Sequence, residues 1–83
     1  MKLRYDLQQL LKKRYNADSF MEMQYKGLDL GFKTDHEGNP LSLFIGHKTP
    51  AGKIKGQRYV RTLKKDSAGN TIKDHWDLKG TTD

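Results

Sequence analysis

The chain of 83 residues contains no cysteine, only two prolines and no long apolar run. The lack of cysteine excludes a disulfide framework, a thiol nucleophile and any metal site that depends on cysteine, and it favours the cytoplasm. Because no apolar stretch has membrane-spanning length and no apolar leader follows Met1, we expect neither membrane insertion nor secretion. A chain of this length predicts a single domain over 1–83 with a modest core.

Motifs of known catalytic or cofactor-binding function are also lacking. No G-x-S-x-G, H-E-x-x-H or calcium-binding loop occurs, and no Lys-Ser/Thr pair follows the second glycine of 46–53, as a phosphate loop would require. His36, His47 and His75 lie in separate segments, and their spacing does not require a shared metal ion. We therefore predict a protein that is not an enzyme and that holds no cofactor or metal.

The first segment has the apolar period of a helix. Its leucines recur at the spacing of one helix face, at Leu3, Leu7, Leu10 and Leu11. Tyr15 extends this stripe. Lys12, Lys13 and Arg14 lie in the last turns, where cations interact favourably with the negative end of the helix dipole. This pattern predicts an amphipathic helix over about 2–15.

From residue 19 onward the apolar period changes to two, which is typical of half-buried strands. The segment 19–25 is compatible with a strand, and 26–27 with either a tight turn or a bulge. The remaining alternating runs predict strands over roughly 28–34, 41–48, 53–65 and 71–78.

Three similar turns separate these runs. Residues 35–39 and 66–70 share the pattern D-x-x-G-N, and 49–52 is the same turn with proline in second place. Such sequences form type I turns closed by a glycine in the left-handed conformation. The fold class is therefore α+β, an N-terminal helix packed on an antiparallel β-meander of four to five strands. The last residues, 80–83, are expected to form a loose tail.

The alternation also predicts which side chains face the helix. The expected core face carries Leu28, Leu30, Phe32, Leu41, Leu43, Ile45, Val60, Ile72, Trp76 and Leu78. The opposite face would be mixed in character and carry Phe44, Tyr59, Arg61, Leu63, Lys73 and His75. Gly56 predicts a bulge or a close approach of two strands, and a bulge there would instead move Tyr59 into the core.

Positive charge is distributed unevenly along the chain. The net charge is +6, and residues 47–65 carry seven Lys and Arg side chains with no acid. The segments on either side, 27–46 and 66–83, each carry more acids than bases. This asymmetry favours a polyanionic partner.

We therefore predict a small non-enzymatic binding module that contacts nucleic acid through the basic hairpin 47–65. Cations would bind phosphates and an aromatic ring would stack on bases. The candidate contact residues are Lys53, Lys55, Arg58, Tyr59, Arg61 and Lys64. The cations Lys12, Lys13 and Arg14 would extend this basic surface if the fold places them on the same side as the hairpin.

The alternative is a protein–protein adaptor or a small homo-oligomer, such as a homodimer, that uses the sheet edge or the mixed face. Lysines on strands also protect sheet edges against aggregation, without any partner. The arrangement of acids separates the two hypotheses. Convergence of the seven cations on one surface favours nucleic acid, whereas interleaving by Asp29, Asp74 and Asp77 favours a protein partner.

Overall fold

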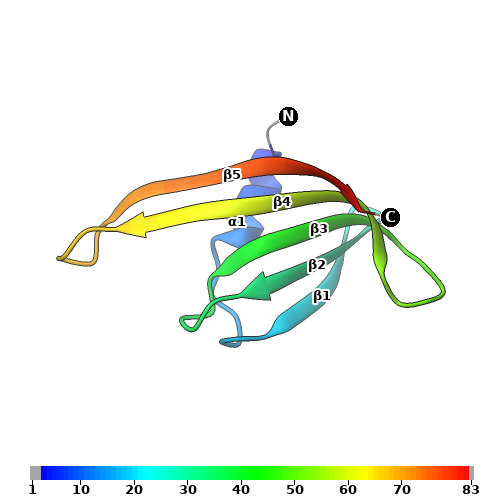
Figure 1. Ribbon diagram of the computed structural model, residues 1–83, viewed down its shortest axis with the longest axis horizontal. Helices are drawn as coiled ribbons and strands as arrows, with labels where there is room; N and C mark the ends of the chain where they lie inside the picture. The colour runs from blue at the N-terminus through cyan, green and yellow to red at the C-terminus, as the bar shows by residue number, and fades with distance from the viewer. Residues whose placement is uncertain (1–2, 83) are drawn as a thin grey trace.

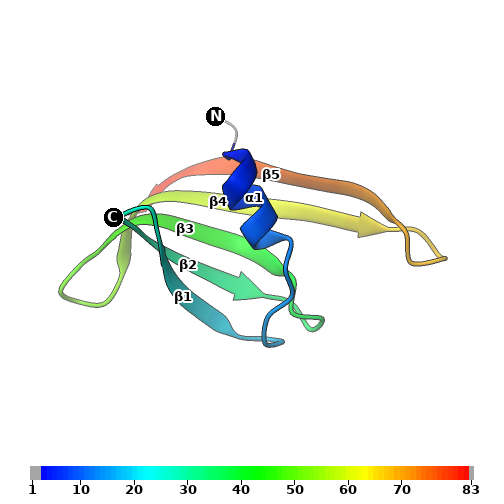
Figure 2. The same cartoon turned by 180° about the vertical axis from the view of Figure 1, so that it is seen from behind.

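The computed structural model describes residues 3–82, which form one helix and five strands. These are α1 (Tyr5–Leu11), β1 (Phe20–Tyr25), β2 (Leu28–Thr34), β3 (Pro40–Lys48), β4 (Ile54–Lys65) and β5 (Thr71–Thr82). The strands form one antiparallel sheet in the order β1-β2-β3-β4-β5 (Figure 1). Helix α1 lies across one face of this sheet (Figure 2). The predicted α+β meander is confirmed. It has five strands, because the segment 19–25 forms a strand of its own, β1.

The two D-x-x-G-N turns have the same internal structure. In the first, Oδ1 of Asp35 accepts hydrogen bonds from the backbone N–H groups of Glu37 and Asn39, both at 2.9 Å. Asp66 makes the equivalent pair of contacts in the second turn. The glycines have φ angles of 84° and 87°, in the left-handed region. Residues 26–27 form a two-residue hairpin turn with positive φ at both positions, as a type I′ turn requires.

Helix α1 is only seven residues long, shorter than the predicted 2–15. The backbone N–H of Lys12 closes the last turn, and Tyr15 lies outside the helix. Its ring still packs on Phe32, with 4.9 Å between ring centroids, and its hydroxyl donates to the carbonyl of Leu10. A helix this short is marginal by itself, so packing on the sheet stabilises it. The first residue of the predicted range lies outside the described residues.

The core lies between α1 and the middle strands. It contains Leu3, Leu7, Leu11, Leu30, Phe32, Leu43 and Tyr59. Removal of such side chains from water is worth about 1.5–3 kcal/mol each. No helix within residues 3–82 has the length and apolar character needed to cross a membrane.

Strand β5 continues further than predicted. Gly80 and Thr81 pair with β4, and β5 ends at Thr82, so the expected loose tail is wrong for 80–82. Asp83, the last residue of that predicted tail, lies outside the described residues. At its other end the β4–β5 hairpin extends beyond the sheet, because β4 pairs with β3 only as far as Val60 (Figure 1). Ile72, expected in the core, is therefore 65% exposed, since this extension is not covered by α1.

Candidate nucleic-acid interface

Strand β4 carries most of the predicted contact residues, and its pairing shows which face each one occupies. Tyr59 lies opposite Leu43, and both belong to the core beneath α1. Arg61 follows two positions later on the same face, and Val60 points to the other face. The prediction that assigned Val60 to the core face, and Tyr59 and Arg61 to the opposite face, is wrong.

The ring of Tyr59 cannot stack on a base in this fold. Only 2% of the residue is exposed, and its hydroxyl contacts Oε1 of Gln57 at 3.3 Å. A tyrosine can bury a large apolar ring while its hydroxyl keeps a polar partner. Tyr59 therefore fills the core better than Val60, the more obviously apolar residue, would.

Arg61 binds other parts of the protein. Its Nε and Nη2 atoms donate to the two carboxylate oxygens of Asp74 at 2.6 and 2.7 Å. Its Nη1 donates to the carbonyl oxygens of Leu11 and Pro40, both at 3.2 Å, and so links α1, β3 and β5. These bonds from Arg61 hold the pKa of the Asp74 carboxyl below its usual value. The side chain of Arg61 is 5% exposed, so its predicted exposure to phosphates is wrong.

The seven cations of 47–65 do not converge on one surface. Three are paired with acids, in Lys48–Glu22 at 2.9 Å, Arg61–Asp74 at 2.6 Å and Lys65–Glu37 at 3.8 Å. The backbone N–H of Lys48 also donates to Asp29, so Asp29 and Asp74 both lie among the cations, and this criterion favours a protein partner over nucleic-acid contact through the hairpin 47–65. The other four make no ion pair within residues 3–82: Lys53, Lys55, Arg58 and Lys64.

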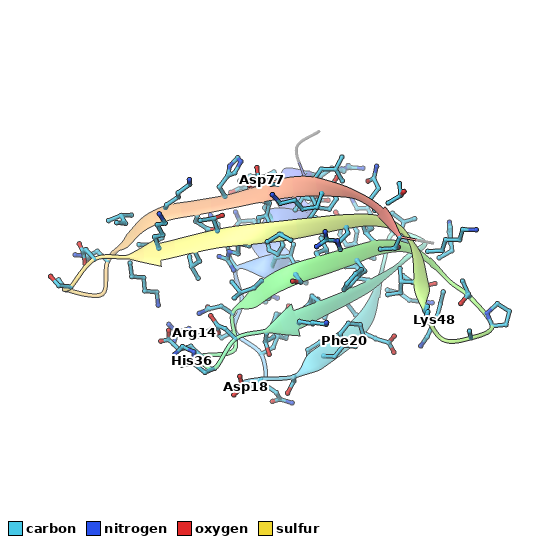
Figure 3. The ribbon with its side chains drawn as sticks, viewed as in Figure 1. Arg14, Asp18, Phe20, His36, Lys48 and Asp77 are labelled. Carbon is cyan, nitrogen blue, oxygen red and sulfur yellow. The ribbon has the colours of Figure 1, made fainter. Side chains whose placement is uncertain are left out.

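The face of the sheet opposite α1, which we call the open face, carries cations and two phenylalanine rings, of which Phe20 is labelled in Figure 3. Strand pairing places Lys33 opposite Phe20, Arg58 opposite Phe44 and Lys64 opposite Lys73. Among these residues, Phe20 is 49% exposed, and its ring centroid lies 6.4 Å from that of Phe44. The sequence patterns had not predicted Phe20 and Lys33 as contacts. Phe20 could have been noticed from sequence, because it is an aromatic residue at a position of β1 where the apolar–polar alternation otherwise places polar side chains.

The strands of the open face carry the acids Glu22, Asp29 and Asp77. Glu22 is paired with the hairpin residue Lys48. Asp77 lies 2.8 Å from Nε2 of His75, a contact that is ionic only when the imidazole is protonated. The cations Lys33 and Arg58 have no such partner within residues 3–82. The cations of the open face, Lys33, Lys48, Arg58, Lys64 and Lys73, outnumber its acids, so the net charge of this face is positive.

The β3–β4 hairpin bends away from the line of the strands at a pair of glycines (Figure 1). Gly46 and Gly56 lie opposite each other. A Cβ atom on Gly46 would lie 2.0 Å from the carbonyl oxygen of Lys55, and one on Gly56 would lie 2.1 Å from that of Ile45. The close approach predicted at Gly56 is confirmed, and the alternative of a bulge between β3 and β4 is not, because pairing continues without a shift.

The bent hairpin forms a pocket on the open face. Ile54 lies over Gly31, where a Cβ atom would be 2.8 Å from Cδ1 of Ile54 and 2.6 Å from Cζ of Phe20. The hydroxyl of Thr82 donates to the carbonyl of Ile54 and accepts from the N–H of Gly56, so the end of β5 holds the hairpin. This space, the hairpin pocket, has a volume of about 330 Å³ and is lined chiefly by Phe20, Phe44, Ile54, Lys33, Lys53 and Glu22.

Lys12, which directly follows α1, does not add its charge to the open face. That side chain lines a separate hollow of about 310 Å³ between α1 and β5, together with Asp74 and Trp76. The condition for extending the basic surface, a position on the same side as the hairpin, is therefore not met by Lys12. Within the part of the chain that the structure describes, no three His, Asp or Glu side chains gather as a metal site.

Comparisons of this chain with protein-family models, with curated proteins and with solved structures found no match. No relative therefore contributes to the functional argument. The chemistry and position of the side chains on the open face carry it.

Proposed function

We propose that this protein is a non-enzymatic module that binds single-stranded nucleic acid across the open face. The supporting observation is that one sheet face combines the exposed ring of Phe20 and the half-buried ring of Phe44 with cations that make no ion pair within residues 3–82. Cations bind phosphates and release counterions, and rings stack on unpaired bases. A single strand suits this face better than a duplex, because its bases can leave the stack and reach the rings.

The proposed contacts differ in part from those expected from sequence. Phosphates would be bound by Lys33, Lys53, Arg58, Lys64 and Lys73, and bases by Phe20 and Phe44. Lys55 is exposed on the bent hairpin and stays a candidate without an assigned contact. Tyr59 and Arg61 have no part in this proposal, because both are buried beneath α1.

Fluorescence anisotropy of labelled oligonucleotides at about 50 mM and about 200 mM salt tests the proposal. We expect a single strand to bind more tightly than a duplex, with a logarithmic salt slope of about −0.7 for each neutralised phosphate. The double variant Arg58→Ala with Lys64→Ala should make that slope shallower by about 1.4. The matched control, Lys12→Ala with Lys13→Ala, removes equal charge near α1 and should leave the slope unchanged.

Two results would contradict this function. Equal weakening in both double variants would mean that net charge, and no particular face, attracts the oligonucleotide. Absence of binding at the lower salt concentration would exclude the open face as a nucleic-acid interface.

Strand β5 favours a second candidate function, binding of a protein partner or of a second copy of the chain. β5 is 12 residues long and pairs only with β4, so its outer edge is open within the described residues. Leu78 and Ile72 on this strand are 37% and 65% exposed. A partner strand could add along this edge through main-chain hydrogen bonds. Sedimentation velocity over a range of concentrations tests self-association, and Ile72→Lys should weaken any dimer that forms there.

A further inference from the structure

The hairpin pocket has an apolar interior of a particular shape. The apolar side chains of Phe20, Phe44 and Ile54 line it, and those of Phe20 and Ile54 also cover the buried backbone of Gly31. The volume of about 330 Å³ lies at the small end of the usual range for ligand pockets, about 300–1,000 Å³. The rings of Phe20 and Phe44 are tilted by 52° with centroids 6.4 Å apart, so a planar base can stack on one ring and contact the other.

The rim of the pocket carries charges of both signs. Lys33 and Lys53 make no ion pair within residues 3–82, so both can bind an anion. Glu22 also lines the pocket, and its Oε1 atom accepts a hydrogen bond from Lys48 at 2.9 Å. Its Oε2 atom has no hydrogen-bond partner among the described residues and can accept one from an N–H group of a ligand.

We propose that the hairpin pocket holds one nucleotide, with the base against Phe20 and Phe44 and the phosphate bound by Lys33 and Lys53. This inference rests on the proposed function, and it specifies the place where one nucleotide of a bound strand is held. The same chemistry has two sources, a nucleotide within a strand on the open face and a free nucleoside monophosphate. Because Glu22 accepts hydrogen bonds, bases with an exocyclic amino group bind more tightly than uracil.

Titration of the full chain followed by ¹H–¹⁵N NMR tests the pocket directly, with adenosine 5′-monophosphate as the probe. The backbone amides of Gly31, Gly52 and Thr82 should shift and saturate. Adenosine lacks the phosphate and ribose 5-phosphate lacks the base, so each should bind about tenfold more weakly. Uridine 5′-monophosphate should bind about threefold more weakly than cytidine 5′-monophosphate, whose base has the same size and carries an amino group, through loss of one hydrogen bond.

Two matched variants separate the pocket from the rest of the open face. Phe20→Ala should lower the affinity for adenosine 5′-monophosphate about tenfold, because base stacking is lost. This side chain is half exposed, so the variant should fold, and its dispersed NMR spectrum will verify that. Lys64→Ala with Lys73→Ala, at the end of the β4–β5 hairpin away from the pocket, should leave mononucleotide affinity within about twofold while it weakens oligonucleotide binding.

The outcomes distinguish this inference from the proposed function. Oligonucleotide binding without shifts at the pocket amides would overturn the nucleotide position and leave the function intact. Saturable binding of the monophosphate in the pocket, without oligonucleotide binding, would support the site with a free nucleotide as its ligand and overturn the proposed function. If neither probe binds, or if the monophosphate shifts only amides outside the pocket, the inference is wrong.

Discussion

The two faces of the sheet are built from alternate residues of the same strands, but they leave positive charge in different states. On the covered face, Arg61 is 5% exposed and bound to the carboxylate of Asp74. On the open face, Arg58 lies three positions earlier on the same strand, is half-buried opposite Phe44, and makes no ion pair within residues 3–82. The residue type is the same, and the difference is the helix that covers one face.

This comparison shows why a count of cations along a strand overestimates the positive surface. A guanidinium that is removed from water needs a carboxylate and further acceptors, because an unpaired buried charge is strongly destabilising. A cation on a solvated face has no such requirement, and an ion pair there adds little stability. Arg61, which alternation places beneath α1, therefore stabilises the fold and is not accessible to a ligand.

The largest effect on the free energy of unfolding is expected when Arg61, the arginine of the covered face, is replaced. Arg61→Ala leaves the Asp74 carboxylate and the carbonyl groups of Leu11 and Pro40 without their partner. We expect the free energy of unfolding to fall by about 3 kcal/mol in urea denaturation. The matched variant Arg58→Ala should change it by less than about 0.5 kcal/mol. Equal losses at the two positions would remove the distinction between the faces.

A smaller effect is expected from the glycine pair that bends the hairpin toward the open face. Gly46→Ala places a Cβ atom 2.0 Å from a backbone carbonyl oxygen, which cannot move without shifting β4. We expect a loss of about 2 kcal/mol in the free energy of unfolding, together with altered NMR shifts at Thr82. Gly52→Asn is the control, because its φ of 84° suits asparagine and nothing lies within 4 Å. A wild-type spectrum for Gly46→Ala would mean that the bend does not depend on this glycine.

The smallest effect is expected on the pH dependence of stability, and it involves only the covered face. Hydrogen bonds from Arg61 lower the pKa of Asp74 in the folded state, so the unfolded chain takes up this proton at the higher pH. The stabilisation is complete above the unfolded pKa of about 3.9 and is lost as pH falls toward the folded pKa.

Asp74→Asn should therefore flatten the acid limb of a plot of unfolding free energy against pH, measured by urea denaturation. Some acid dependence should remain, because other carboxyl groups such as Asp6, bound by Lys26, also have a lowered pKa. Arg58→Ala should keep the wild-type acid limb. An acid limb that is unchanged in Asp74→Asn would contradict the role of this pair.

Local chemistry made several features predictable from sequence. The helix, the meander and its turns follow from apolar periods and from residues such as Asp35 and Gly38, whose contacts lie within a few positions. The close approach at Gly56 was predictable because glycine inside a strand is typical of sites where two backbones come unusually near each other. In the candidate site, Lys53, Arg58 and Lys64 were identified from sequence, since charge is visible there directly.

The tertiary structure alone decided which face of β4 is covered. Alternation defines two faces but does not specify which one receives the helix, and Val60 made the wrong face look apolar. The partner of Arg61 lies on the next strand and its carbonyl acceptors come from α1 and β3, so its burial depends on contacts far apart in sequence. The hairpin pocket likewise exists only because β1, β2 and the bent hairpin meet over Gly31. Such long-range packing has no local pattern from which it could be predicted.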